Sequence, residues 1–237
     1  MSSTIAFNCN FRLDDGTERI FTLQLEASTL DLISEQRDEQ PAWTALECQQ
    51  CPNCPLKPAE HPQCPIAANL VDLVDFFKGT YSYEEVDVRL ETPERSYSKR
   101  TSVQQAVSSV LGIYMVTSGC PIMNKLRPMV RFHLPFATIA ETAYRAIAMY
   151  LMAQYFRKKR GLEPDWDLRD LALIYEDIQR VNTSFLKRLD EIETRDASAN
   201  ALVILDCFAS QVAFSIDEED LSEFEVFFAP YLQKDEK

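Results

Sequence analysis

Four of the seven cysteines in this sequence are each followed directly by a proline, and their spacing is typical of a metal site. They are Cys51, Cys54, Cys64 and Cys120. The two-residue gap between Cys51 and Cys54 is that of a metal knuckle, in which two thiolates bind one ion while turn N–H groups point at the sulfurs. The following proline restricts the cysteine to extended backbone, which lowers the entropy lost on binding. We therefore predict a metal centre held by these four thiolates.

Cys64 and Cys120 share a second feature, because each precedes Pro-Ile and then an apolar segment. Each is predicted to cap the start of a helix with proline at the first helical position. There the helix dipole and the free N–H groups favour a thiolate and lower its pKa. A closed site of this kind would clamp Cys120 to a segment far away in sequence. Cys48 and His61 are spare candidate ligands, so the sequence offers more ligands than one site needs.

The metal itself is predicted from the ligand set. A knuckle suits a tetrahedral four-thiolate site and favours a structural Zn²⁺. A [4Fe–4S] cluster is the alternative, since Cys-Pro ligands and a three-plus-one spacing also occur in iron–sulfur proteins. Three interpretations of the same cysteines remain: they contact a haem, they bind another metal, or they are unrelated buried thiols.

A second group of residues follows Cys120 and is a candidate anion-binding site. Arg127, Arg131 and His133 place positive charge near a predicted helix start in an otherwise acidic chain, and together they could receive a carboxylate or another anion. A sharper hypothesis makes Cys120 a nucleophile with His133 as its base. The plainer interpretation is a hydrogen-bonded core histidine and arginines paired with surplus acids, so no catalytic residue is assigned.

Composition excludes several classes of protein. The 237 residues carry 24 basic and 37 acidic side chains, a formal charge of −13, which argues against nucleic-acid partners and anionic membranes. The five glycines are isolated, so neither a P-loop nor a dinucleotide-binding loop is present. With no signal-like segment and no apolar run of the ~20 residues that span a bilayer, we expect a cytoplasmic protein. In a reducing compartment, cysteines are metal ligands or buried thiols rather than disulfides.

The elements that must position these residues follow from periodicity. Alternating apolar residues predict two hairpins, over residues 5–25 and 86–101, and the polar last strand is expected at a sheet edge. Apolar stripes predict helices over 42–49, 66–78, 103–115, 138–160, 165–189, 198–215 and 221–232. The predicted fold is α+β, with N-terminal hairpins forming a small antiparallel sheet, followed by a C-terminal helical bundle. Residues 1–135 would form an α+β part that carries the cysteines, and residues 136–237 would form a helical part packed on it. Alternatively, both would form one compact domain. Cys9 and Cys207 are predicted core residues.

One segment resembles a known group of sequences. The string GCPIMNKLRPMVRFHLPF, from Gly119 to Phe136, resembles a segment of an uncharacterised bacterial protein family that also carries the upstream Cys-Pro cluster. The resemblance covers about half of the chain. It implies a bacterial, cytosolic protein and no known activity.

The function predicted from these residues is a metal-binding protein with a structural four-cysteine zinc site, acting as a protein-interaction or regulatory module. The expected partner is another protein or a second copy of this chain. An iron–sulfur redox or sensor protein using the same cysteines is the alternative. The scarcity of histidine and the lack of an acid–base group favour a non-enzymatic protein. An enzyme acting on a small anionic ligand at Arg127, Arg131 and His133 is a third hypothesis.

Overall fold

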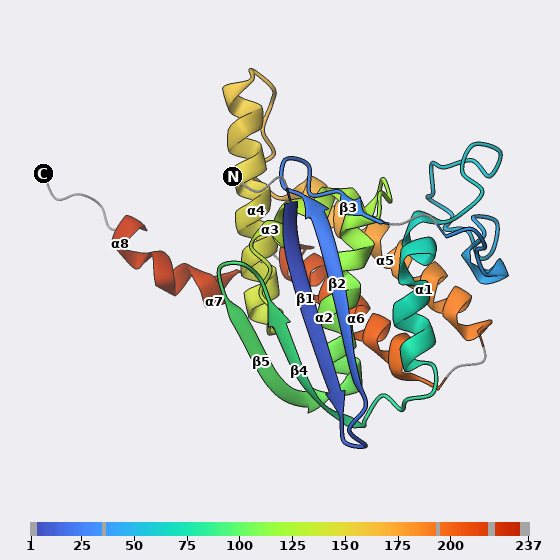
Figure 1. The fold of residues 1–237 in the computed structure, drawn as a ribbon. Coiled ribbons are helices and arrows are strands. Elements are labelled where there is room, and N and C mark those ends of the chain that lie inside the picture. The colour runs from blue at the N-terminus through green and yellow to red at the C-terminus, as the bar shows by residue number, and fades with distance from the viewer. Residues whose placement is uncertain (1–3, 35–36, 193–194, 218–220, 233–237) are drawn as a thin grey trace, which may run out of the picture.

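A computed structural model describes residues 4–34, 37–192, 195–217 and 221–232, and it confirms the α+β class. An N-terminal five-stranded antiparallel sheet is followed by a C-terminal helical region (Figure 1). The elements, with 3-10 helices labelled η, are β1 (Thr4–Leu13), β2 (Glu18–Glu26), β3 (Leu32–Ile33), η1 (Ala42–Thr44), α1 (Pro65–Phe77), β4 (Glu85–Glu91), β5 (Ser96–Ser102), α2 (Val103–Thr117), η2 (Met123–Leu126), α3 (Arg127–Arg131), α4 (Ile139–Lys159), α5 (Arg169–Asp190), α6 (Ala197–Asp217), α7 (Ser222–Glu225), η3 (Val226–Phe228) and α8 (Ala229–Leu232).

The first predicted hairpin forms between β1 and β2. The turn N–H of Thr17 donates to Asp15 Oδ1 at 2.8 Å, and Gly16 takes a φ of 86°, which a residue without a Cβ adopts at little cost. The register pairs Cys9 with Phe21, so the alternating apolar residues of both strands share one face. Cys9 is fully buried on that face, which confirms its prediction as a core residue.

The sheet has one apolar face and one polar face. Its strand order is β3-β2-β1-β4-β5, so the predicted edge position of the polar last strand is confirmed. On β5 only Thr101 is buried, and Arg100 lies on the exposed face, where it pairs with Asp14, Glu85 and Asp87. Helices α1 and α2 cover the apolar face (Figure 1).

The helices begin and end largely where capping signals predict. Thr138 and Glu141 form the predicted capping box at the start of α4: the Glu141 N–H donates to Thr138 Oγ1 at 3.2 Å, and the Thr138 N–H donates to Glu141 Oε2 at 2.8 Å. Gly161, with a φ of 71°, follows the last turn of α4. Pro65 stands at the first turn of α1 with Cys64 as the N-cap, as predicted.

The buried residues from 1–135 and from 136–237 belong to one hydrophobic core. It is continuous because α2 packs against α6, and α6 packs in turn against α5 and α4. By length and composition, α6 over Ala197–Ile216 is apolar enough to cross a membrane, the one such helix among the described residues. Core helices of globular proteins meet the same criterion, so this observation assigns no location.

Three local predictions were wrong. Only η1 forms within 42–49, because Ala45 takes an extended conformation with a ψ of 140° and bridges to Gln63. Cys207 is exposed, because the inward stripe of α6 includes Ala209 and Val212 and leaves position 207 on the outer side. Cys120 precedes a turn and the 3-10 helix η2 instead of an α-helix.

Candidate metal centre

The four Cys-Pro cysteines meet at one place in the fold. Cys51 and Cys54 lie in the loop after η1, Cys64 lies at the start of α1, and Cys120 follows α2. All four line a single cavity of about 20 Å³, which is closed on its other sides by side chains that include Leu46, Ile122, Val181 and Phe185. Cys120, distant in sequence, thus lines the same cavity as the upstream cysteines, and metal binding by the four stays a prediction.

The knuckle between Cys51 and Cys54 is a tight turn. The Cys54 N–H donates to the Cys51 carbonyl at 3.0 Å, which closes the turn between the two cysteines. Burial, reinforced by the charges of the neighbouring Cys64, Cys120 and Cys54, raises the pKa of the Cys51 thiol to about 11. The thiols thus lie within electrostatic range of one another, and in the absence of a cation Cys51 stays protonated at neutral pH.

Cys64 joins the site from the start of α1. Its backbone is extended, with φ −69° and ψ 121°, because Pro65 follows it and excludes the helical conformation. The Cys64 N–H donates to the Thr44 carbonyl at 2.8 Å, which ties the helix start to η1. The residue is buried, with 8% of its surface exposed, and its side chain makes no capping hydrogen bond. The sulfur is therefore held at a helix N-terminus without being used as a cap.

Cys120 is surrounded by backbone donors. Hydrogen bonds from the backbone of Met123 and Ile122 lower the pKa of its thiol, although burial, the larger effect, raises it above its ordinary value. The turn is fixed because the Asn124 N–H donates to the Cys120 carbonyl at 3.0 Å. N–H groups aimed at a sulfur are the usual surroundings of a thiolate ligand, so these two bonds would stabilise Cys120 once it is deprotonated.

Arg188 of α5 is the one charged side chain that lines this cavity, and sequence reasoning missed it. The residue is 2% exposed, and its Nη1 donates to the carbonyls of Trp43 and Ala45 at 2.6 Å each. Among the described residues it forms no ion pair with a carboxylate. The available signal was its spacing, three residues after the buried Phe185 and seven after Val181.

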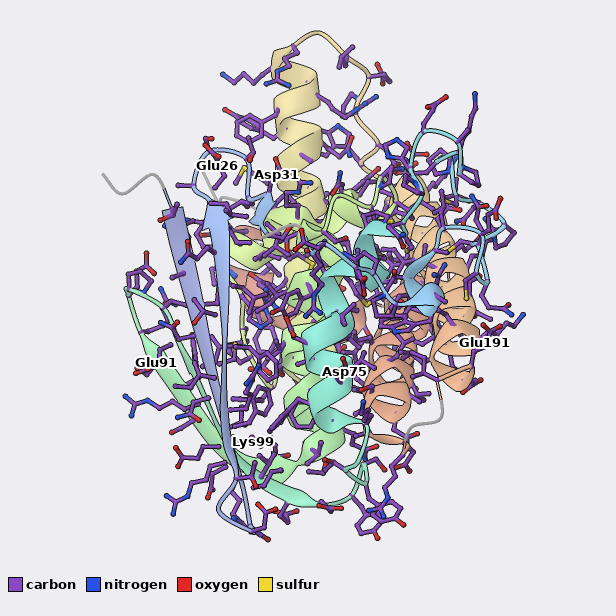
Figure 2. All side chains as sticks on the ribbon, turned by 45° about the vertical axis from the view of Figure 1, so that its right-hand side comes forward. Glu26, Asp31, Asp75, Glu91, Lys99 and Glu191 are labelled. Atoms are coloured by element: carbon purple, nitrogen blue, oxygen red, sulfur yellow. The ribbon has the colours of Figure 1, made fainter. Side chains whose placement is uncertain are left out.

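The spare candidates lie outside the cavity. Cys48 donates from its sulfur to Glu191 Oε2 at 3.1 Å (Glu191 is labelled in Figure 2), and burial with that hydrogen bond raises the pKa of its thiol. His61 is exposed on the loop before α1. Neither residue lines the cavity that the other four cysteines share.

The cysteines are gathered but are not already in a ligand geometry. In the ranges that the structure describes, no three His, Cys, Asp or Glu side chains stand as a ready-made metal-binding group. A protonated, uncharged thiol has no reason to approach its neighbours closely, whereas a bound cation would draw deprotonated sulfurs together. Binding at this place therefore requires deprotonation and an inward movement of the sulfur atoms.

The candidate anion-binding residues have separate partners. Arg127 is bound to Asp31 at 2.6 Å and to the Thr29 carbonyl at 3.1 Å (Asp31 is labelled in Figure 2), and Arg131 pairs with Glu94 at 3.5 Å. His133 packs edge-to-face against a phenylalanine of β1, with 6.3 Å between ring centroids. Both arginines are thus engaged with acids, and anion binding by the three residues stays a prediction.

Comparison with known proteins adds the family. A family model described as a domain of unknown function, DUF6901, matches residues 6–229. The match covers nearly the whole chain, including every candidate residue described above. No curated protein and no solved structure matched this chain.

Proposed function

The chain belongs to the DUF6901 family, and we propose that Cys51, Cys54, Cys64 and Cys120 bind one Zn²⁺ that clamps the fold of a protein-interaction or regulatory module. A single observation carries the proposal. Cysteines from three segments, one of them more than fifty residues from the others, line the same small cavity. Four Cys-Pro dipeptides with unrelated structural roles have no physical reason to meet at one point.

The size of the cavity favours a single ion over a cluster. A space of about 20 Å³ is close to the ~10–15 Å³ that admits one water-sized sphere. A [4Fe–4S] cube contains eight atoms and would push the four segments well apart. Zn²⁺ with four thiolates at about 2.3 Å requires only that the sulfur atoms move inward.

The charge of the surroundings also supports a thiolate site. Four thiolates around one Zn²⁺ leave two negative charges in excess, which are costly in a closed cavity unless a cation is near. Arg188 supplies that cation, since it is buried and lines the same cavity. The N–H groups around Cys120 supply further positive potential.

The metal would act through folding. The loop that carries Cys51 and Cys54 has little regular structure, and its Asn53 donates to the Asp177 carbonyl of α5 at 3.1 Å. A zinc clamp would tie this loop and the start of α1 to the segment after α2. Because binding free energy at a structural site is folding free energy, removal of the metal should loosen all of these segments together.

The module's interaction surface is proposed at the C-terminal helical segment, formed by α7, η3 and α8. This segment extends away from the body of the fold (Figure 1), and its Val226, Phe227 and Tyr231 side chains are 67%, 72% and 85% exposed. Exposed apolar side chains grouped on one projecting element are typical of contacts with another protein. A second copy of this chain or a different protein could take this position.

The test is metal analysis of protein purified without oxygen, combined with two cysteine variants. We expect one colourless zinc per chain, lost in Cys54→Ser, which should also unfold several kcal/mol more easily. Cys207→Ser, at an exposed position, is the matched control and should keep both metal and stability. Bound iron with absorption near 400 nm would favour the [4Fe–4S] cluster over zinc. Wild-type protein that is folded and free of metal would overturn the proposal.

A further inference from the structure

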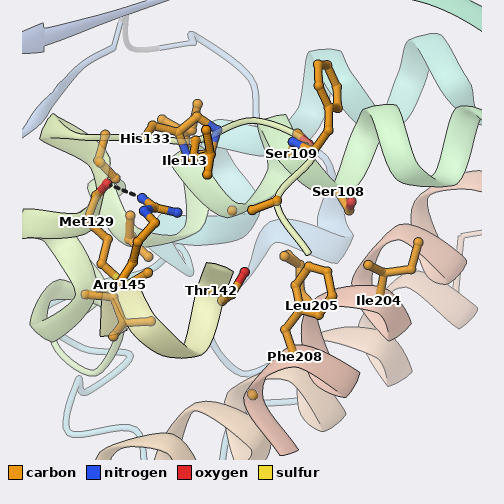
Figure 3. Close-up of a pocket in the computed structure, with 18 of the residues that line it drawn as sticks. Ser108, Ser109, Ile113, Met129, His133, Thr142, Arg145, Ile204, Leu205 and Phe208 are labelled. Atoms are coloured by element: carbon orange, nitrogen blue, oxygen red, sulfur yellow. Dashed lines mark hydrogen bonds between the residues drawn. The ribbon is translucent and has the colours of Figure 1, made fainter. Parts of the chain in front are cut away.

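A second and much larger cavity lies away from the cysteines. It holds about 410 Å³ and is lined by α2, the segment from η2 to α4, α5 and α6, with Lys99 of β5 at its wall. Its walls are mostly apolar, and α6 contributes Ile204, Leu205 and Phe208 (Figure 3). The volume falls within the roughly 300–1,000 Å³ of small-molecule sites. The proposed zinc site does not include this cavity.

Arg145 of α4 brings a positive charge to one wall. Its Nη2 donates to the carbonyls of Met129 and Phe132 at 2.9 and 3.0 Å. In the described part of the chain, no carboxylate lies within ion-pair distance of it, and burial lowers the pKa of its guanidinium. A partly buried guanidinium with carbonyl partners and spare donors is suited to a carboxylate.

His133 lies near Arg145 on the same side of the cavity (Figure 3). Burial and the charge of Arg145 lower the pKa of its imidazole to about 3, so the ring is neutral at physiological pH. One ring nitrogen donates a hydrogen bond to the backbone carbonyl of Ser109, and this bond partly opposes the lowering of the pKa. The buried Nε2 has no protein partner. A neutral ring that donates through one nitrogen presents the other as an acceptor.

Asn182 of α5 contributes a second unpaired acceptor. The residue is 2% exposed and lines the cavity. Its Nδ2 donates to Asp206 Oδ1 at 3.2 Å, which fixes the orientation of the amide, and the buried Oδ1 has no protein partner. A buried acceptor left unpaired is unfavourable, so a ligand with a donor group would gain affinity here.

We propose that this cavity binds a small amphiphilic hydroxy acid, with its carboxylate at Arg145, its hydroxyl donating to His133 Nε2 or Asn182 Oδ1, and its apolar body against α6. Each part of the ligand answers one feature of the cavity. The guanidinium requires an anion, the two orphan acceptors require a donor, and the remaining wall requires hydrocarbon. A simple fatty acid satisfies the first and third features and leaves the acceptors unpaired.

The proposal is tested by titrating the purified full-length protein with three ten-carbon probes below their micelle concentrations. These are 3-hydroxydecanoate, decanoate, which lacks the hydroxyl, and decan-1-ol, which lacks the charge. We expect 3-hydroxydecanoate to bind about tenfold more tightly than decanoate, because one hydrogen bond to a buried acceptor is lost in the latter. Decan-1-ol should bind most weakly. Calorimetry, supported by the rise in melting temperature on saturation, measures all three.

Gly112→Met is the variant that fills the cavity without removing a polar group. A Cβ at Gly112 would lie 3.6 Å from Leu205 Cδ2, an ordinary contact, and Gly112 lies in α2 at the cavity wall. The longer side chain extends into the space that the ligand would occupy, and replacing glycine within a helix favours folding. We expect this variant to be folded and to lose binding of 3-hydroxydecanoate at least tenfold. Its zinc content should be unchanged, which separates this proposal from the metal centre.

Arg145→Met tests the charge. It should lose most of the preference for decanoate over decan-1-ol that the wild-type protein shows, because among the described residues only the exposed Lys99 would remain as a cation at the cavity wall. If this variant does not fold, the result with Gly112→Met decides alone. Equal affinities of the wild-type protein for the three probes, or unchanged binding of 3-hydroxydecanoate by Gly112→Met, would overturn the proposal.

Discussion

Replacing Arg188 by methionine should destabilise the protein more than any other single loss of charge on α5. The side chain is 2% exposed and donates two hydrogen bonds of 2.6 Å to backbone carbonyls of the cysteine-rich segment. A hydrogen bond from a charged donor contributes about 1.5–3 kcal/mol, and methionine would leave two acceptors without this partner. Methionine recovers part of the loss by filling the same space, so we expect a net loss of about 3–4 kcal/mol in the free energy of unfolding.

The matched control is Arg180→Met on the same helix. Arg180 is about half exposed, and within the described ranges its ion pairs are with Glu176 and Asp177 of its own helix. Its loss should therefore change the free energy of unfolding by at most about 1 kcal/mol. Urea unfolding followed by circular dichroism measures both variants, with and without added zinc. If Arg188 also offsets the negative charge of the four thiolates, Arg188→Met should bind zinc more weakly than Arg180→Met. Equal stabilities of the two variants would refute the role assigned to Arg188.

Two further predictions concern single residues away from the cysteines. The pKa of His133 lies at about 3 in the fold against an ordinary value of 6.5, so the unfolded chain binds the extra proton first, and stability is lost as pH falls below about 6.5. Between pH 7 and pH 5 the loss should be about 2 kcal/mol in urea titrations, and a His133→Gln variant with the same slope would contradict this. Thr138→Ala removes the acceptor of the α4 capping box and should cost about 1 kcal/mol in thermal unfolding, whereas a change below about 0.3 kcal/mol would show that the cap adds nothing.

Local structure was largely determined by the sequence. Alternation fixed the faces of the hairpins, and Asp15-Gly16 fixed their first turn, because both depend on residues within a few positions of each other. The capping box at Thr138 was readable for the same reason. The Cys-Pro dipeptides marked the candidate ligands, since proline constrains the residue before it wherever it occurs.

The tertiary structure alone decided what depends on distant parts of the chain. The helix predicted over 42–49 forms only as η1, because Ala45 bridges to Gln63 and Arg188, far along the chain, binds carbonyls that a helix would have used within itself. The outward position of Cys207 depended on which side of α6 the neighbouring helices cover. The large cavity arose from packing between segments far apart in sequence, and its unpaired His133 and Asn182 atoms have no counterpart in any local pattern. Spacing along a sequence thus identifies which side chains belong together chemically, whereas burial, charge and the orphaned acceptor atoms are properties of contacts that only the folded chain creates.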